Sequence, residues 1–136
     1  MSTSDIEVET WLRGYHIYRD IWKNIDRDQE VFLKKQPNNQ FDKNAIGGYV
    51  KSLNPEDETL LTEIGHLPRN FSRALKKING EEVLSFKCRV ADKKAVRASG
   101  LNGLQIRVTI TITLTKKKIV MLRKQLAKIS DCCLIL

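Results

Sequence analysis

The chain has 136 residues, of which 41% are hydrophobic and 29% are charged, and this length and composition are typical of one globular domain. No stretch approaches the roughly 20 apolar residues of a membrane-spanning helix, and the polar residues 1–5 lack the form of a secretory signal. The formal net charge is +8, with six Lys/Arg and one Asp between residues 116 and 131. This balance is consistent with an anionic partner, such as nucleic acid or acidic lipid, and also with a solvated basic surface that has no specific partner.

The three cysteines, Cys88, Cys132 and Cys133, show no metal-ligand spacing, and the two histidines lie far from the adjacent cysteine pair. This arrangement argues against structural zinc, and neighbouring cysteines cannot easily bridge to each other. We therefore expect no cofactor and a reducing, intracellular location, either nuclear or cytoplasmic.

Six segments have the alternating or β-branched composition of strands. The clearest is the last, in which Leu, Ile and Val alternate with Gln, Arg and Thr. The first predicted strand is expected to bend at Gly14, and Gly47 and Gly48 are expected to loosen the third. A basic loop is expected over residues 92–103. The predicted strands are residues 6–19, 30–35, 45–53, 63–67, 83–90 and 104–114.

Two segments have helical spacing. Pro68 suits the first turn of a helix that stops at the Asn-Gly pair of residues 79–80. Residues 116–129 form a basic amphipathic helix, whose apolar stripe is expected to pack on the sheet. The predicted fold is mainly β: a small OB-like β-barrel of about six strands, with one internal helix and a C-terminal amphipathic helix. We place the barrel at residues 10–114, between a polar N-terminal segment (1–9) and a basic C-terminal tail (115–136).

Enzyme signatures are missing from the sequence, which has no phosphate-binding glycine loop, no His-Glu metal spacing and no nucleophile elbow. Cys88 falls on the apolar face of its predicted strand, so we assign it to the core rather than to catalysis. We expect a binding protein and not an enzyme.

The polar loop between the second and third predicted strands, L-K-K-Q-P-N-N-Q-F-D-K-N-A-I at residues 33–46, offers groups suited to binding. Asn38 and Asn39 can donate to and accept from phosphate oxygens, sugar hydroxyls and base edges. Phe41 can stack on an unpaired base, and Asp42 can accept a hydrogen bond from a terminal sugar hydroxyl. The alternative is purely structural: the asparagines make the turn, the ring folds inward and the carboxylate caps nearby backbone N–H groups.

The series P-N-N-Q-F-D-K-N-A-I, followed about 20 residues later by I-G-H-L-P-R, resembles the HIRAN domain. This module occurs as a stand-alone unit and at the front of a fork-remodelling ATPase, and the resemblance covers roughly residues 10–114. It implies an OB-like barrel that captures the 3′ end of single-stranded DNA in a pocket formed by the 37–42 loop and the 65–69 segment. A partner protein would then supply the ATPase, because none follows the domain in this sequence.

The family's site residues match this loop one by one. The resemblance implies that Asn38 and Asn39 contact the DNA backbone and the terminal nucleotide. It further implies that Phe41 stacks on a base and that Asp42 reads the 3′ hydroxyl.

The rest of the implied pocket comes from two other segments. His66 and Arg69 would face phosphate. A second stacking tyrosine in the family's first strand aligns most simply with Ile17, so His16 and Tyr18 are the candidates for that side of the pocket.

The last four residues, Cys133-Leu134-Ile135-Leu136, match the pattern for C-terminal prenylation, and a terminal Leu favours geranylgeranyl. The basic helix before them would supply a second membrane signal. The alternative function is therefore a non-catalytic protein-interaction or membrane-tethered adaptor that keeps the fold without binding DNA ends. Burial of these apolar residues against the core explains the same sequence without modification.

Overall fold

Strand β6 (Leu104–Thr115) is the centre of the sheet and matches the clearest prediction from the sequence. It pairs antiparallel with β1 (Thr3–Arg13) on one side and with β5 (Val83–Arg97) on the other. Its alternating apolar side chains are fully buried, and these are Ile106, Val108, Ile110, Ile112 and Leu114. One face of β6 therefore forms the middle of the hydrophobic core.

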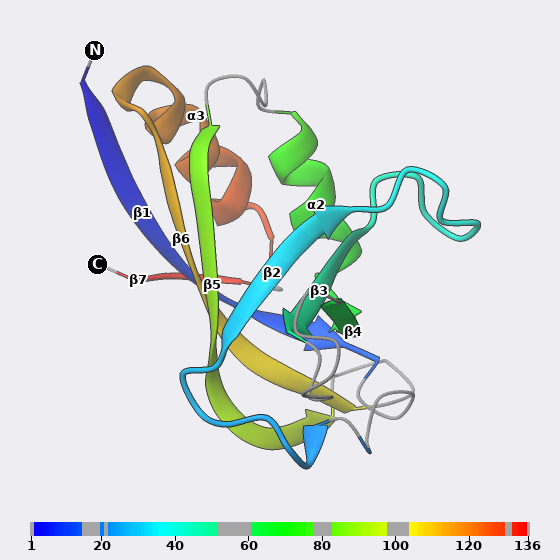
Figure 1. Cartoon of the computed structure of the whole chain (residues 1–136). Helices are drawn as coiled ribbons and strands as arrows, with labels where there is room; N and C mark the ends of the chain where they lie inside the picture. Colours follow the sequence, from blue (N-terminus) through cyan, green and yellow to red (C-terminus); the bar gives the residue numbers. More distant parts are fainter. Residues whose placement is uncertain are drawn as a thin grey trace.

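The computed structural model describes residues 2–14, 20, 22–51, 61–77, 83–97, 104–129 and 132–135. Over these residues the chain is mostly β, as predicted, and Figure 1 shows the arrangement of its elements. The remaining strands and the helices are β2 (Glu30–Lys35), β3 (Ile46–Lys51), β4 (Leu61–His66), β7 (Cys133–Ile135), α2 (Arg69–Lys76) and α3 (Lys116–Ala127).

The sheet closes on itself. Its strand order is β4-β3-β2-β5-β6-β1-β7, and β4 also pairs with β1, where Arg13 lies opposite His66. This pairing joins six strands into a ring and covers edges that would otherwise be open. The ring confirms the predicted OB-like fold. It also places His66 between two neighbouring strands, because the same residue lies opposite Gly47 of β3.

The largest differences from the predicted elements concern β1, β5 and β7. Strand β1 begins at Thr3, because Ile6 and Val8 continue the inward alternation, so residues 3–9 belong to the sheet and not to a separate segment. Strand β5 continues to Arg97 through part of the predicted loop, and register shifts after Val90 absorb its irregular alternation. Strand β7, which pairs with β1, is too short for its sequence to indicate a strand.

The glycine pair in β3 permits close packing rather than loosening the strand. Pairing with β2 is continuous through Gly47 and Gly48, and the irregularity is one register shift relative to β4, next to Gly48. A Cβ on Gly48 would lie 2.9 Å from Leu12 Cδ2, and a Cβ on Gly47 would lie 2.3 Å from Gln36 Nε2. At the ring closure, a Cβ on Gly65 would lie 2.7 Å from the Arg13 carbonyl oxygen.

The two helices lie side by side and cover the core (Figure 1). Helix α2 buries Phe71 and Leu75, and α3 buries Leu122 and Leu126, which confirms that the apolar stripe of the tail helix packs on the sheet. Trp22 is also buried, and its indole N–H donates to the carbonyl oxygen of residue 64 at 2.9 Å. Among the described residues, no helix is long and apolar enough to cross a membrane.

Candidate nucleic-acid interface

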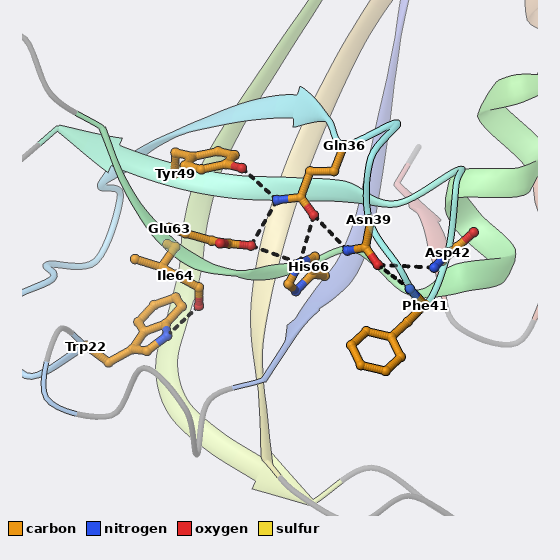
Figure 2. A network of polar contacts seen from close by, with 9 residues as sticks. All are labelled: Trp22, Gln36, Asn39, Phe41, Asp42, Tyr49, Glu63, Ile64 and His66. Carbon is orange, nitrogen blue, oxygen red and sulfur yellow. Dashed lines mark hydrogen bonds and ion pairs between the residues drawn. The ribbon is translucent and has the colours of Figure 1, made fainter.

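One side chain, Gln36, ties the loop between β2 and β3 to the sheet (Figure 2). Its Nε2 donates to Tyr49 Oη at 2.6 Å and to Glu63 Oε1 at 2.9 Å. Its Oε1 accepts a hydrogen bond from Asn39 Nδ2 at 3.1 Å and lies 3.0 Å from His66 Nε2. Both ends of the amide are therefore occupied, so Gln36 fixes the position of the loop relative to β3 and β4.

Asn39 organises the loop from within. Its Oδ1 accepts hydrogen bonds from the backbone N–H groups of Phe41 at 2.9 Å and Asp42 at 3.1 Å, which is the geometry of an Asx turn. Since its Nδ2 is bonded to Gln36, the side chain serves the turn, as the structural alternative anticipates. Asn38 lies exposed beside it, with its amide accessible from solvent.

Phe41 is the most exposed large apolar residue described in the structure, with 87% of its surface accessible. The ring points away from the loop, in the opposite direction to the carboxylate of the adjacent Asp42 (Figure 2). The ring does not fold inward, so it contributes almost nothing to the core. Because Asn39 holds the backbone at this position, the ring is presented to solvent by an ordered turn.

Asp42 and Arg69 connect the loop to the start of α2. Arg69 Nη2 donates to the Phe41 carbonyl oxygen at 3.4 Å, and Arg69 Nε lies 3.7 Å from Asp42 Oδ2. The other carboxylate oxygen, Oδ1, accepts from the backbone N–H of Asn44 at 2.9 Å. A separation of 3.7 Å is an ion pair and not a hydrogen bond, so Oδ2 keeps its capacity to accept one.

His66 is held in place by the network around Gln36. Its Nε2 lies 2.8 Å from Glu63 Oε1 and 3.0 Å from Gln36 Oε1. Because both of these atoms are acceptors, Nε2 must carry the proton that it shares with them. The ring remains partly exposed, with a third of its side-chain surface accessible.

The structure brings most of the predicted site residues to one surface. His66 joins the loop through Gln36, and Arg69 joins it through the backbone at Phe41. His16 and Tyr18, the candidates from the first strand, lie outside the described residues. The residues gathered at this surface are Asn38, Asn39, Phe41, Asp42, His66 and Arg69.

Sequence reasoning missed the residues that position this surface. Gln36, Tyr49 and Glu63 come from three different strands or strand ends, and their spacing in the sequence gives no sign that they meet. The sequence offered one indication of this arrangement, Gly47. A glycine within a strand often marks the close approach of another group, which here is the Gln36 amide.

Outside the candidate site, the Cys88 thiol and possible metal ligands are the groups to consider. Burial raises the pKa of the Cys88 thiol to about 12, against a smaller opposing effect of the Arg89 charge. The thiol therefore stays protonated and unreactive at neutral pH, which fits the predicted core position. Over the described ranges of the chain, no group of three or more His, Cys, Asp or Glu side chains could hold a metal ion.

Cys133, the candidate for prenylation, is exposed and lies in β7 opposite Glu9 of β1. Cys132 is partly buried and packs against the core.

The fold and the site together define an OB-like domain with a hydrogen-bonded polar loop that presents an aromatic ring to solvent. The family model of the HIRAN domain matches residues 4–115, from the start of β1 to the end of β6. The chain therefore belongs to the HIRAN domain family, the family that its loop motif resembles.

Two solved structures are similar to this chain. The crystal structure of the HIRAN domain of human HLTF aligns with a TM-score of 0.61 and 19% identity over 91% of each chain. The NMR structure of the HLTF HIRAN domain in its DNA-bound conformation aligns with a TM-score of 0.53 and 21% identity, over 90% of this chain and 87% of that one. At these identities the likeness shows the fold. No curated protein matches the sequence.

Proposed function

We propose that this domain binds single-stranded DNA and captures its 3′ end on the surface formed by residues 36–42, His66 and Arg69. The observation that carries the proposal is the exposed Phe41 ring, held by an ordered turn beside an acidic group and a basic group. Family membership supports it, because another member, the HLTF HIRAN domain, is described in a DNA-bound conformation. The proposed role is one of binding, without catalysis.

Phe41 supplies the contact to a base. The exposed ring gains nothing from folding, and stacking on the terminal base would remove much of its apolar surface from solvent. Such stacking contributes about 1–3 kcal/mol per base and tolerates any base, because every base has a π-face. The ring therefore accounts for affinity without sequence preference.

Asp42 supplies the recognition of the terminus. Its Oδ2 retains acceptor capacity and can take a hydrogen bond from a free 3′ hydroxyl. A phosphate at the same position would bring a second negative charge against the carboxylate, which is unfavourable. An internal nucleotide has no 3′ hydroxyl to donate. The Asp42 carboxylate beside Arg69 thus favours a free end over a blocked or continuous strand.

Arg69 and Lys43 supply positive charge to the phosphates behind that end. Both side chains are exposed, and Arg69 uses only part of its guanidinium in the contacts to Phe41 and Asp42. Affinity from such contacts falls as salt concentration rises.

The test compares 10-nucleotide deoxythymidine strands with a 3′ hydroxyl or a 3′ phosphate, labelled at the 5′ end, by fluorescence anisotropy. We expect the free 3′ end to bind at least about tenfold more tightly, since one charge-assisted hydrogen bond contributes about 1.5–3 kcal/mol. A 5′ phosphate on an otherwise identical strand is the control and should have little effect. Equal affinity for the two 3′ ends, or no binding of either, would refute the proposal.

The variant Asp42→Asn sharpens this test. Asparagine keeps an oxygen that can accept from the Asn44 N–H, so the turn is retained. The negative charge is lost, so the preference for the hydroxyl over the phosphate should shrink towards one. A preference that is unchanged in this variant would assign end recognition to other residues.

A further inference from the structure

A cavity opens where strands β2 and β5 separate. Their ladder pairs Glu30 with Arg89 and Val31 with Cys88. Both strands then continue, β2 to Lys35 and β5 back to Val83, and no further pair between them is found in the described part of the chain. Figure 1 shows the two strands diverging towards α2.

The cavity has a volume of about 460 Å³, and much of its wall is apolar. If the ladder had continued in register, Leu33 would face Phe86, and both residues line the cavity instead. Phe86 is partly exposed in a strand whose next inward residue, Cys88, is buried. Leu75 of α2 completes this apolar surface. An exposed aromatic ring at the mouth of an apolar cavity is typical of a site that takes a ligand.

The strand edges on either side also favour a particular kind of ligand. Residues 32–35 of β2 pair with β3 on one edge, and residues 83–87 of β5 pair with β6 on one edge. Among the described residues, their facing edges have no strand between them. Backbone N–H and C=O groups along such an edge pair readily with an added strand.

Among the residues that the structure describes, the charged side chains that line the cavity are all lysines. Lys35, Lys43 and Lys76 line it, no carboxylate does, and no ion pair of these three lysines occurs within the described ranges. Ser72 also lines the cavity, and its Oγ is fully buried without a hydrogen-bond partner in the structure.

We propose that this cavity is a peptide site, which takes an extended acidic segment of a partner protein as an added strand between β2 and β5. Apolar side chains of the peptide would contact Leu33, Leu75 and Phe86, and its carboxylates would meet the three lysines. The site adjoins the DNA-binding surface, because Pro37 and Lys43 line the cavity, whereas Phe41, Asp42, His66 and Arg69 do not. Its proposed ligand is a different class of molecule, so the peptide site does not depend on the proposed DNA function.

The test is a selection of random 12-residue peptides, displayed on phage, against the full chain. The site variant carries Lys35→Glu and Lys76→Glu and keeps Lys43, because Lys43 also belongs to the proposed DNA-binding surface. The matched control carries Lys117→Glu and Lys124→Glu on α3, which makes the same change in net charge at exposed positions. The selected peptides should combine Asp or Glu with β-branched or aromatic residues, bind the control as they bind wild type, and lose at least tenfold in affinity for the site variant.

Strand addition has its own signature in the selected peptide. N-methylation removes one backbone donor at a time, and in a strand only every second N–H faces the partner edge. Binding should therefore be lost at alternate positions and kept at the positions between.

Several outcomes would overturn the proposal. These are a selection that yields no binder, peptides without acidic enrichment, equal binding to the site variant, and an N-methylation profile without alternation. Loss of single-stranded DNA binding by the site variant, with no peptide bound by wild type, would assign the cavity to the nucleic-acid surface instead. Peptide binding with no DNA binding would leave this site intact and refute only the DNA proposal.

Discussion

Gln36→Leu is the substitution that tests most sharply how the candidate site is held together. Leucine is apolar and its side chain is one atom shorter than that of glutamine, so it can make none of the four contacts that the amide makes to Tyr49, Glu63, Asn39 and His66. Each hydrogen bond contributes about 0.5–1.5 kcal/mol, and water can replace part of it at these half-exposed positions. We therefore expect the free energy of unfolding to fall by about 2 kcal/mol, at the lower end of the summed range.

The assay is urea unfolding followed by tryptophan fluorescence, since the buried Trp22 reports on the core. The matched control is Gln40→Leu, which removes the same amide from an exposed position of the same loop. Gln40→Leu should change stability by less than about 0.5 kcal/mol. Equal effects of the two substitutions would show that the network contributes nothing specific, and the account of how the loop is positioned would be wrong.

Three further predictions concern the ring, the glycine and the buried thiol. Phe41→Ala should leave stability unchanged, because the ring is exposed, and should weaken single-stranded DNA binding by about 5- to 150-fold, the equivalent of 1–3 kcal/mol of stacking. The control is Val120→Ala on α3, and a Phe41→Ala variant that binds normally would exclude stacking by this ring. Gly47→Ala should displace the Gln36 amide, because the new Cβ would overlap its Nε2, and should also press on Tyr49 Cε1 at 2.9 Å. The double variant Gln36→Leu/Gly47→Ala should therefore lose less stability in urea unfolding than the sum of the two single losses, and additive losses would contradict this coupling. The pKa of the Cys88 thiol is about 12 in the folded chain and 9.0 in the unfolded one, so the stability that this difference contributes is complete below pH 9 and is lost as the pH rises towards 12. Between pH 8 and pH 10 the free energy of unfolding of the wild type should fall by about 1.4 kcal/mol more than that of Cys88→Ala. Parallel pH profiles of the two proteins would show that the thiol is not buried.

The fold could be predicted from the sequence wherever periodicity was regular. The alternation of residues 104–114 gave the central strand, and the stripe of residues 116–129 gave a helix that packs on the sheet. The predicted fifth strand ended too early, at residue 90, because the second half of β5 does not alternate and stays paired with β6 only through register shifts. Strand β7 has three residues, and its pairing with β1 depends on tertiary proximity that local sequence does not encode.

The candidate site could be predicted in part. Phe41 and Asp42 stood out because a ring and a carboxylate are unusual in a polar turn of a basic chain. Asn39 was placed correctly in the loop, but its amide serves the turn. Gln36 could not be singled out, because its role comes from partners 13 and 27 residues further along the chain. Long-range hydrogen bonds of this kind appear only once the strands are paired.

The most direct test of the central claim is a two-dimensional amide NMR titration of the chain with a deoxythymidine strand that has a free 3′ hydroxyl. If the loop captures the DNA end, the largest chemical-shift changes will fall on residues 36–45 and 65–70. If nucleic acid binds only through general positive charge, the changes will instead be centred on the basic helix α3, residues 116–127. That second result would show that the loop does not capture the DNA end.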